Sequence, residues 1–142
     1  MLLTGKTVLV VEPEPFAAYA LERRLRDLDA EDVIVLRNPD DAKLELAERW
    51  SESERTGAKD RRRVPRAPRP GIAIIDFDES REAAGRLAAD LARRHVKLVR
   101  TTRDGAVDGL AEGGAGATPV VRKPYDMIEI ERAIGQHYGV LI

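Results

Sequence analysis

Several features that would point to a function are missing from this sequence. None of the 142 residues is cysteine, which excludes disulfide bonds and thiolate chemistry and fits a reducing compartment. Lys and Arg (24) nearly balance Asp and Glu (25), so the chain as a whole has no general attraction to nucleic acid or to an anionic membrane. No apolar run is long enough to span a bilayer or to serve as a signal peptide. These absences predict a cytoplasmic protein with no membrane partner.

What the sequence does contain suits one domain, residues 1–142, because its length and its 43% hydrophobic share match a single core. Five short apolar runs are typical of strands buried on both faces of a parallel sheet. They are Thr7–Val11, Val33–Leu36, Ile72–Ile75, Val96–Val99 and Val120–Val121.

Helix patterns alternate with these runs. Pro15 opens the first helix, Asn38 with Pro39 opens a second that runs towards Trp50, and Asp126 caps the last. Apolar residues at helical spacing mark the buried faces of the first, third and last helices: Ala18, Leu21, Leu25 and Leu28; Ala84, Leu87, Ala88 and Leu91; Met127, Ile130 and Ile134. Five glycines between positions 105 and 116 leave room for a short helix at best. The alternation predicts an α/β, flavodoxin-like fold of strand order 2-1-3-4-5 with helices on both faces.

One stretch, residues 51–70, does not follow the alternation. It has no apolar periodicity, is rich in Arg and Lys, and contains three prolines that disfavour a helix. We interpret it as a solvated basic insertion between the second helix and the third strand. The alternative is a contact arm for an anionic partner such as nucleic acid, binding through charge, because the segment has no aromatic side chain to stack on bases.

Polar residues follow four of the predicted strands. Because ligands of such folds bind at the carboxyl ends of the strands, these residues are expected to share one crevice. They are Glu12, Asp76, Thr101 and Lys123. A carboxylate with a hydroxyl and an ammonium nearby can hold a phosphoryl group, and Mg²⁺ would normally join through oxygen ligands.

Four segments resemble the signatures of response-regulator receiver domains of two-component signalling. They are Val8-Leu-Val-Val-Glu-Pro-Glu-Pro, Ile74-Ile-Asp-Phe-Asp, Val99-Arg-Thr-Thr and Arg122-Lys-Pro-Tyr. The resemblance implies that Asp76 stands at the phosphoacceptor position, and that Thr101 and Lys123 stand where phosphate contacts lie. It also implies that Glu12, Asp76 and Asp78 would be the metal-site residues.

The sequence departs from that family at three positions. Pro13 replaces the second of two adjacent acids and offers no side-chain ligand, so Mg²⁺ binding is expected to be weak. Val120 stands where the family has an aromatic switch residue, and Thr102 stands where a small residue usually follows the hydroxyl. These departures indicate an atypical receiver whose phosphorylation site is degraded.

The leading functional hypothesis is a non-enzymatic, stand-alone module that signals through protein contacts, since the chain ends with the last helix. The family resemblance places the partner surface at Arg122 and Tyr125, and leaves homodimerisation open. The alternative is a regulator phosphorylated on Asp76 by a histidine kinase or a phosphotransfer protein. Two minor alternatives are nucleic-acid binding through the basic insertion and a phosphatase of the haloacid dehalogenase type, because Asp76-Phe-Asp78 also matches an Asp-x-Asp pair.

Overall fold

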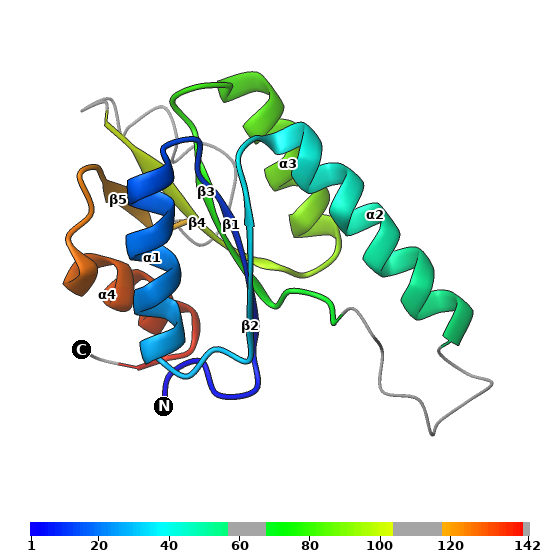
Figure 1. Ribbon diagram of the computed structural model, residues 1–142, viewed down its shortest axis with the longest axis horizontal. Helices are drawn as coiled ribbons and strands as arrows, with labels where there is room; N and C mark the ends of the chain where they lie inside the picture. Colours follow the sequence, from blue (N-terminus) through cyan, green and yellow to red (C-terminus); the bar gives the residue numbers. More distant parts are fainter. Residues whose placement is uncertain (57–67, 104–117, 141–142) are drawn as a thin grey trace.

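The computed structural model describes residues 1–56, 68–103 and 118–140, and shows five parallel strands and four helices within them (Figure 1). In chain order the elements are β1 (Thr7–Val11), α1 (Pro15–Asp27), β2 (Asp32–Leu36), α2 (Pro39–Thr56), β3 (Ile72–Asp76), α3 (Arg81–Arg93), β4 (Lys97–Thr102), β5 (Val120–Arg122) and α4 (Met127–His137). The sheet order is β2-β1-β3-β4-β5. The predicted flavodoxin-like fold and its strand order are therefore confirmed. The short helix expected between positions 105 and 116 lies outside the described residues.

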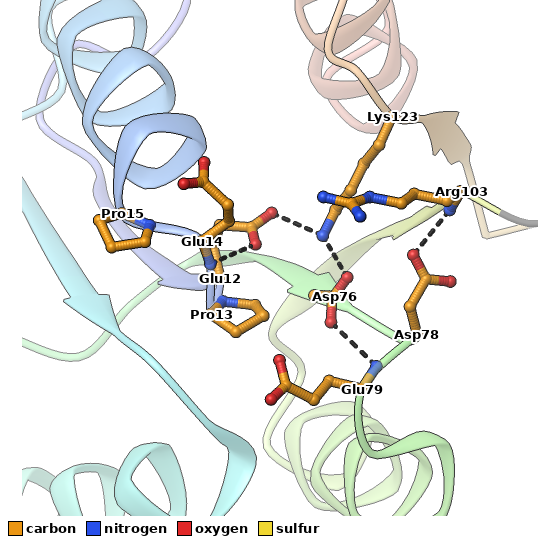
Figure 2. A pocket seen from close by; sticks show the side chains of 9 residues that line it. All are labelled: Glu12, Pro13, Glu14, Pro15, Asp76, Asp78, Glu79, Arg103 and Lys123. Carbon is orange, nitrogen blue, oxygen red and sulfur yellow. Dashed lines mark hydrogen bonds and ion pairs between the residues drawn. The ribbon is translucent and has the colours of Figure 1, made fainter.

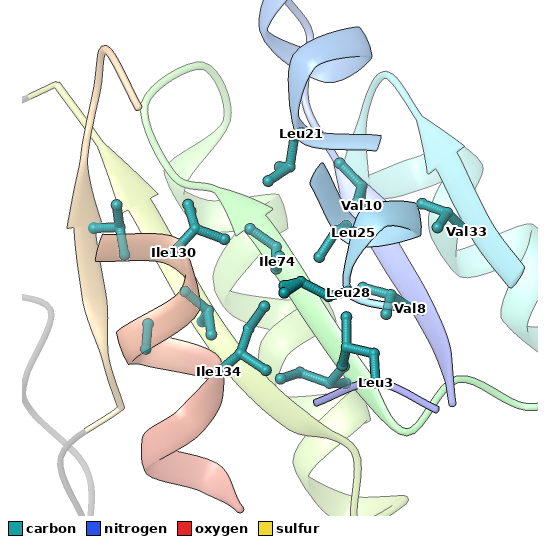
Figure 3. Packing of buried hydrophobic residues seen from close by; sticks show 14 residues of the cluster. Leu3, Val8, Val10, Leu21, Leu25, Leu28, Val33, Ile74, Ile130 and Ile134 are labelled. Atoms are coloured by element: carbon teal, nitrogen blue, oxygen red, sulfur yellow. The ribbon is translucent and has the colours of Figure 1, made fainter. Parts of the chain in front are cut away.

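The sheet is covered by α1 and α4 on one face and by α2 and α3 on the other (Figure 1). Side chains alternate between the two faces along each strand, and both faces are buried. Val8 and Val10 thus pack under α1 and α4, whereas Leu9 and Val11 pack under α2 and α3. Figure 3 shows the first of these two cores, to which Leu25 of α1 and Ile134 of α4 both belong.

The strand register brings the functional residues to one edge of the sheet. Val11, the last residue of β1, pairs with Ile75 in β3, and Asp76, the last residue of β3, pairs with Thr101 in β4. Glu12 follows β1 directly, and its backbone N–H donates to the carbonyl of Leu36 at 2.9 Å. All of these chain ends point in the same direction because the strands are parallel.

The turn between β1 and α1 is fixed by local capping. Glu14 is the N-cap of α1, and its carboxylate accepts a hydrogen bond from the Ala17 backbone N–H at 2.6 Å. Pro15 occupies the first helical position, where its missing N–H costs nothing. This turn starts α1 immediately beside Glu12.

Helix α2 continues to Thr56, so the prediction of a non-helical insertion from residue 51 is wrong for its first six residues. Residues 51–56 contain neither proline nor glycine, and nothing in them stops a helix that is already propagating. The absence of apolar periodicity therefore did not mark the end of the helix. Residues 57–67 of the predicted insertion lie outside the described residues.

The other end of the predicted insertion is attached to the domain. The guanidinium of Arg49 donates to the Pro68 carbonyl at 2.9 Å. The guanidinium carbons of Arg69 and Arg94 lie 4.9 and 4.7 Å from the centroid of the Trp50 ring. In the described ranges no helix is both long enough and apolar enough to cross a membrane.

Candidate functional site

Three of the four polar residues predicted at the strand ends meet at one pocket. Glu12, Asp76 and Lys123 line a pocket of about 400 Å³, together with Asp78 and Arg103 (Figure 2). Arg103 was not singled out from the sequence, because a charged residue next to a glycine-rich stretch carries no recognisable signal. It lies at the pocket because it directly follows β4.

The Lys123 ammonium lies between two carboxylates. Its Nζ is 2.8 Å from Glu12 Oε1 and also forms an ion pair with Asp76 Oδ1. The three side chains are almost fully buried, with exposed fractions of 6% for Lys123, 0% for Glu12 and 3% for Asp76. Two buried carboxylates facing one ammonium leave a single net negative charge, which is far less costly to bury than two unpaired anions.

The outer oxygens of both carboxylates are also bonded to the protein. Glu12 Oε2 accepts the Glu14 backbone N–H at 3.0 Å, and Asp76 Oδ2 accepts the Glu79 backbone N–H at 3.3 Å (Figure 2). Each carboxylate therefore uses both of its oxygens within the chain. Buried charged groups require hydrogen-bond partners of this kind.

Tyr125 differs from its predicted place on the partner surface. Its ring is half-buried against the α1/α4 core, and its hydroxyl donates a hydrogen bond to Glu12 Oε1. The hydroxyl also lies 3.3 Å from Thr101 Oγ1. Burial, followed by the hydrogen bond to Glu12, raises the pKa of the Tyr125 hydroxyl well above its ordinary value. This inward orientation could not be predicted, because Tyr125 was assigned to the partner surface by family resemblance alone.

Thr101 is completely buried and does not line the pocket. Its hydroxyl is directed to the Ile75 carbonyl at 3.4 Å and lies close to the Tyr125 oxygen. The predicted phosphate-contacting hydroxyl is thus present at the right strand end but faces inward. Contact with a phosphoryl group on Asp76 would require it to turn.

Asp78 bonds to the end of β4 rather than to the Lys123 cluster. One carboxylate oxygen accepts the Thr102 hydroxyl at 2.6 Å, and the other accepts the Arg103 backbone N–H at 2.7 Å. The departure at position 102 therefore has a structural partner at position 78. This clasp connects the turn after β3 to the end of β4.

The arrangement does not fit a magnesium site as it stands. Mg²⁺ needs near-octahedral oxygen ligands, yet Pro13 supplies none, the Asp78 carboxylate faces Thr102, and an ammonium occupies the space between Glu12 and Asp76. Across residues 1–56, 68–103 and 118–140, no group of three acidic or histidine side chains is placed to hold a metal. Of the remaining predicted residues, Arg122 is exposed, and Val120 packs partly buried against the α2/α3 core.

Solved structures of response regulators share this fold. The response regulator receiver protein from Burkholderia phymatum matches with a TM-score of 0.72 and 21% identity, over 96% of this chain and 97% of that one. The receiver domain of the PhyR response regulator from Erythrobacter litoralis matches with a TM-score of 0.69 and 19% identity, over 96% and 92%. The PhyR stress response regulator matches with a TM-score of 0.67 and 19% identity over 94% of this chain, which spans only 45% of that protein.

No family model and no curated protein matches the sequence itself. At identities of about a fifth, the structural matches establish the fold. This chain has the receiver fold of two-component response regulators, and the resemblance carried by the four sequence motifs is confirmed at that level.

Proposed function

We propose that this chain is a receiver-like signalling module that acts through protein–protein contacts, with an output that does not depend on phosphorylation of Asp76. The observation that carries the proposal is the buried Lys123 ammonium between Glu12 and Asp76. The Lys123 ammonium already offsets part of the negative charge that a bound metal ion would offset in this crevice. A module of this kind binds its partner whether or not Asp76 is phosphorylated.

Weak Mg²⁺ binding is part of this proposal. A metal ion would have to displace the Lys123 ammonium from Glu12 and Asp76, and Pro13 offers no third carboxylate to offset that loss. Phosphorylation of Asp76 should be weakened as well, because phosphoryl transfer to a carboxylate depends on a cation to neutralise the developing charge. Lys123 alone supplies one positive charge, whereas a lysine together with a bound Mg²⁺ would supply three.

The partner surface is proposed around Arg122, on the outer side of β5 and α4. Arg122 is exposed and lines a hollow of about 370 Å³ with Glu129 and Arg132 of α4. Charged groups of both signs around a hollow suit a polar protein partner, including a second copy of this chain. Tyr125 does not line this hollow, and its hydroxyl faces Glu12.

The alternative is a regulator that accepts a phosphoryl group on Asp76 from a histidine kinase or a phosphotransfer protein. The open pocket beside Asp76, with Arg103 and Lys123 at its wall, favours it. A phosphatase of the haloacid dehalogenase type has less support, because the Asp78 carboxylate that would act as its acid is bonded to Thr102 and Arg103. No catalytic activity is proposed. Most of the basic insertion, residues 51–70, on which nucleic-acid binding would rest lies outside the described ranges, since these omit residues 57–67.

Two measurements test the proposal. Wild type, Asp76→Asn and Pro13→Asp are incubated with a small-molecule phosphodonor and Mg²⁺, and their intact masses are recorded. We expect little phosphoryl adduct on the wild type, none on Asp76→Asn, and more on Pro13→Asp. Partner affinity is then measured for wild type and Asp76→Asn, with and without the donor, and for Arg122→Glu as the surface variant.

We expect Asp76→Asn to bind the partner like the wild type and Arg122→Glu to bind it at least tenfold more weakly. Coupling between sites is typically about 1 to 3 kcal/mol, or roughly 5- to 150-fold in affinity. A donor-dependent gain of more than tenfold that disappears in Asp76→Asn would establish the phosphorylatable alternative instead.

A further inference from the structure

Tyr125 makes contacts that the proposed function does not use. Its ring packs against the α1/α4 core, and the ring centroid lies 5.9 Å from the Lys123 ammonium. Its hydroxyl reaches both Glu12 and Thr101. It is the side chain that connects the carboxylate after β1 with the hydroxyl in β4. These are two of the residues on which any receiver chemistry in this crevice would depend.

The direction of the protons can be assigned from the chemistry of the groups. A tyrosine hydroxyl has one proton, and the buried Glu12 carboxylate is a stronger acceptor than a neutral hydroxyl. The Tyr125 hydroxyl therefore donates its hydrogen bond to Glu12, and the phenol oxygen remains free to accept one. The Thr101 proton is then held between the Ile75 carbonyl and the Tyr125 oxygen, and both of these acceptors lie on the inner side of the crevice.

Glu12 consequently receives three donors: the Lys123 ammonium, the Tyr125 hydroxyl and the Glu14 backbone N–H. A cation that binds Glu12 Oε1 must displace the hydrogen bond that the Tyr125 hydroxyl donates to this oxygen. That step leaves the polar hydroxyl of a half-buried tyrosine without its partner, and such unsatisfied groups are costly. The phenol therefore competes with cations for the same oxygen.

We infer that Tyr125 is a positioning residue that keeps the crevice closed to metal: its hydroxyl holds Glu12 and Thr101 in inward-facing hydrogen bonds and thereby weakens cation binding. The inference rests on the proposed function and adds to it. It assigns the weak metal binding to a side chain other than Pro13 and Val120, the departures noted in the sequence. It also separates two contributions, the ligand missing at Pro13 and the oxygen already occupied at Glu12.

The test is a calorimetric titration with MgCl₂ of four proteins: wild type, Tyr125→Phe, Glu12→Gln and the double variant Tyr125→Phe/Glu12→Gln. Tyr125→Phe keeps the ring packing and removes only the oxygen. Tyr138→Phe is the matched control, because Tyr138 is also partly buried but packs beside Lys6 and Lys97, away from the pocket residues. Thermal melts of each variant verify that it is folded at the titration temperature.

We expect Tyr125→Phe to bind Mg²⁺ about tenfold more tightly than wild type, the factor associated with one hydrogen bond to a charged group. Tyr138→Phe should match the wild type, and Glu12→Gln should abolish the gain in the double variant. The inference is overturned if Tyr125→Phe binds Mg²⁺ no more tightly than Tyr138→Phe, or if the gain survives the loss of the Glu12 carboxylate.

A second measurement needs no variant and covers the case in which Tyr125→Phe does not fold. In wild type labelled with ¹³C at the tyrosine ring, the Tyr125 hydroxyl-bearing carbon should shift on saturation with Mg²⁺, whereas that of Tyr138 should stay. An unmoved Tyr125 signal at saturation overturns the inference. All of these outcomes are independent of the partner-affinity test, which decides the proposed function whichever side chain closes the crevice.

Discussion

Replacing Lys123 with methionine tests whether the crevice is held together by charge. Methionine keeps a flexible chain of similar length but leaves Glu12 and Asp76 facing each other without a cation. Both carboxylates are buried, with side chains 0% and 3% exposed, so solvent cannot screen their repulsion. Removing one partner from a buried ion pair typically costs about 3 to 5 kcal/mol.

For a chain of this size, about 1 kcal/mol corresponds to roughly 3 to 4 °C in melting temperature, so Lys123→Met should lower it by roughly 10 to 20 °C. Urea unfolding followed by circular dichroism measures the free energy directly, with an unchanged slope indicating that the folded state is intact. The matched control is Lys43→Met on the exposed side of α2, which should change stability by less than about 0.5 kcal/mol.

A second variant identifies the cause of the loss. Combining Lys123→Met with Glu12→Gln removes one of the two charges, and should restore at least about 1 kcal/mol relative to Lys123→Met alone. The reasoning fails if Lys123→Met unfolds within about 1 kcal/mol of the wild type, or if the double variant recovers nothing. Either result would mean that Lys123 does not neutralise a buried pair.

Three further predictions concern neighbouring groups. Pro13→Asp should tighten Mg²⁺ binding at least roughly tenfold in calorimetry, because it adds a charged ligand beside the two carboxylates. Thr102→Val should lower the unfolding free energy by about 1 kcal/mol in urea, since it removes the 2.6 Å hydrogen bond to Asp78 at nearly constant volume. The raised pKa of Tyr125 means that the folded state holds a proton that the unfolded state releases above about pH 10, so stability should fall there by about 1.4 kcal/mol per pH unit for this residue. Urea melts at pH 9 and 11 should show a shallower loss in Tyr125→Phe, and an equal loss would contradict the buried, bonded hydroxyl.

The fold could be predicted because its determinants are local and repetitive. Val8 to Val11 are apolar at every position, which is typical of a strand buried on both faces, and the structure buries them under helices on both sides. The strand ends were less certain: β4 extends to Thr102, because its polar residues Arg100 and Thr101 pair in register with β5. Polar positions inside a strand have no periodic signature, so that end could not be read from the sequence.

Much of the candidate site's membership was predictable, but its contacts were not. The fold rule places Glu12, Asp76 and Lys123 in one crevice whatever their rotamers, because parallel strands end on the same side. Which way Thr101 and Tyr125 turn depends instead on competition among acceptors that come from distant parts of the chain. Such a choice is made by tertiary packing and leaves no pattern in the sequence.

The substitutions around the crevice have a common electrostatic sense. With an acid at position 13, three carboxylates would face one lysine, and the surplus of two negative charges could be buried only with a cation bound. Pro13 removes one of those charges, and the Tyr125 hydroxyl adds a donor to a carboxylate that remains. The Lys123 ammonium then suffices to hold Glu12 and Asp76 in the folded state. A crevice whose negative charge is already largely offset by its own lysine gains little from metal or phosphate. The free energy that would drive a switch is correspondingly small, because a ligand shifts two states only through its differential affinity for them.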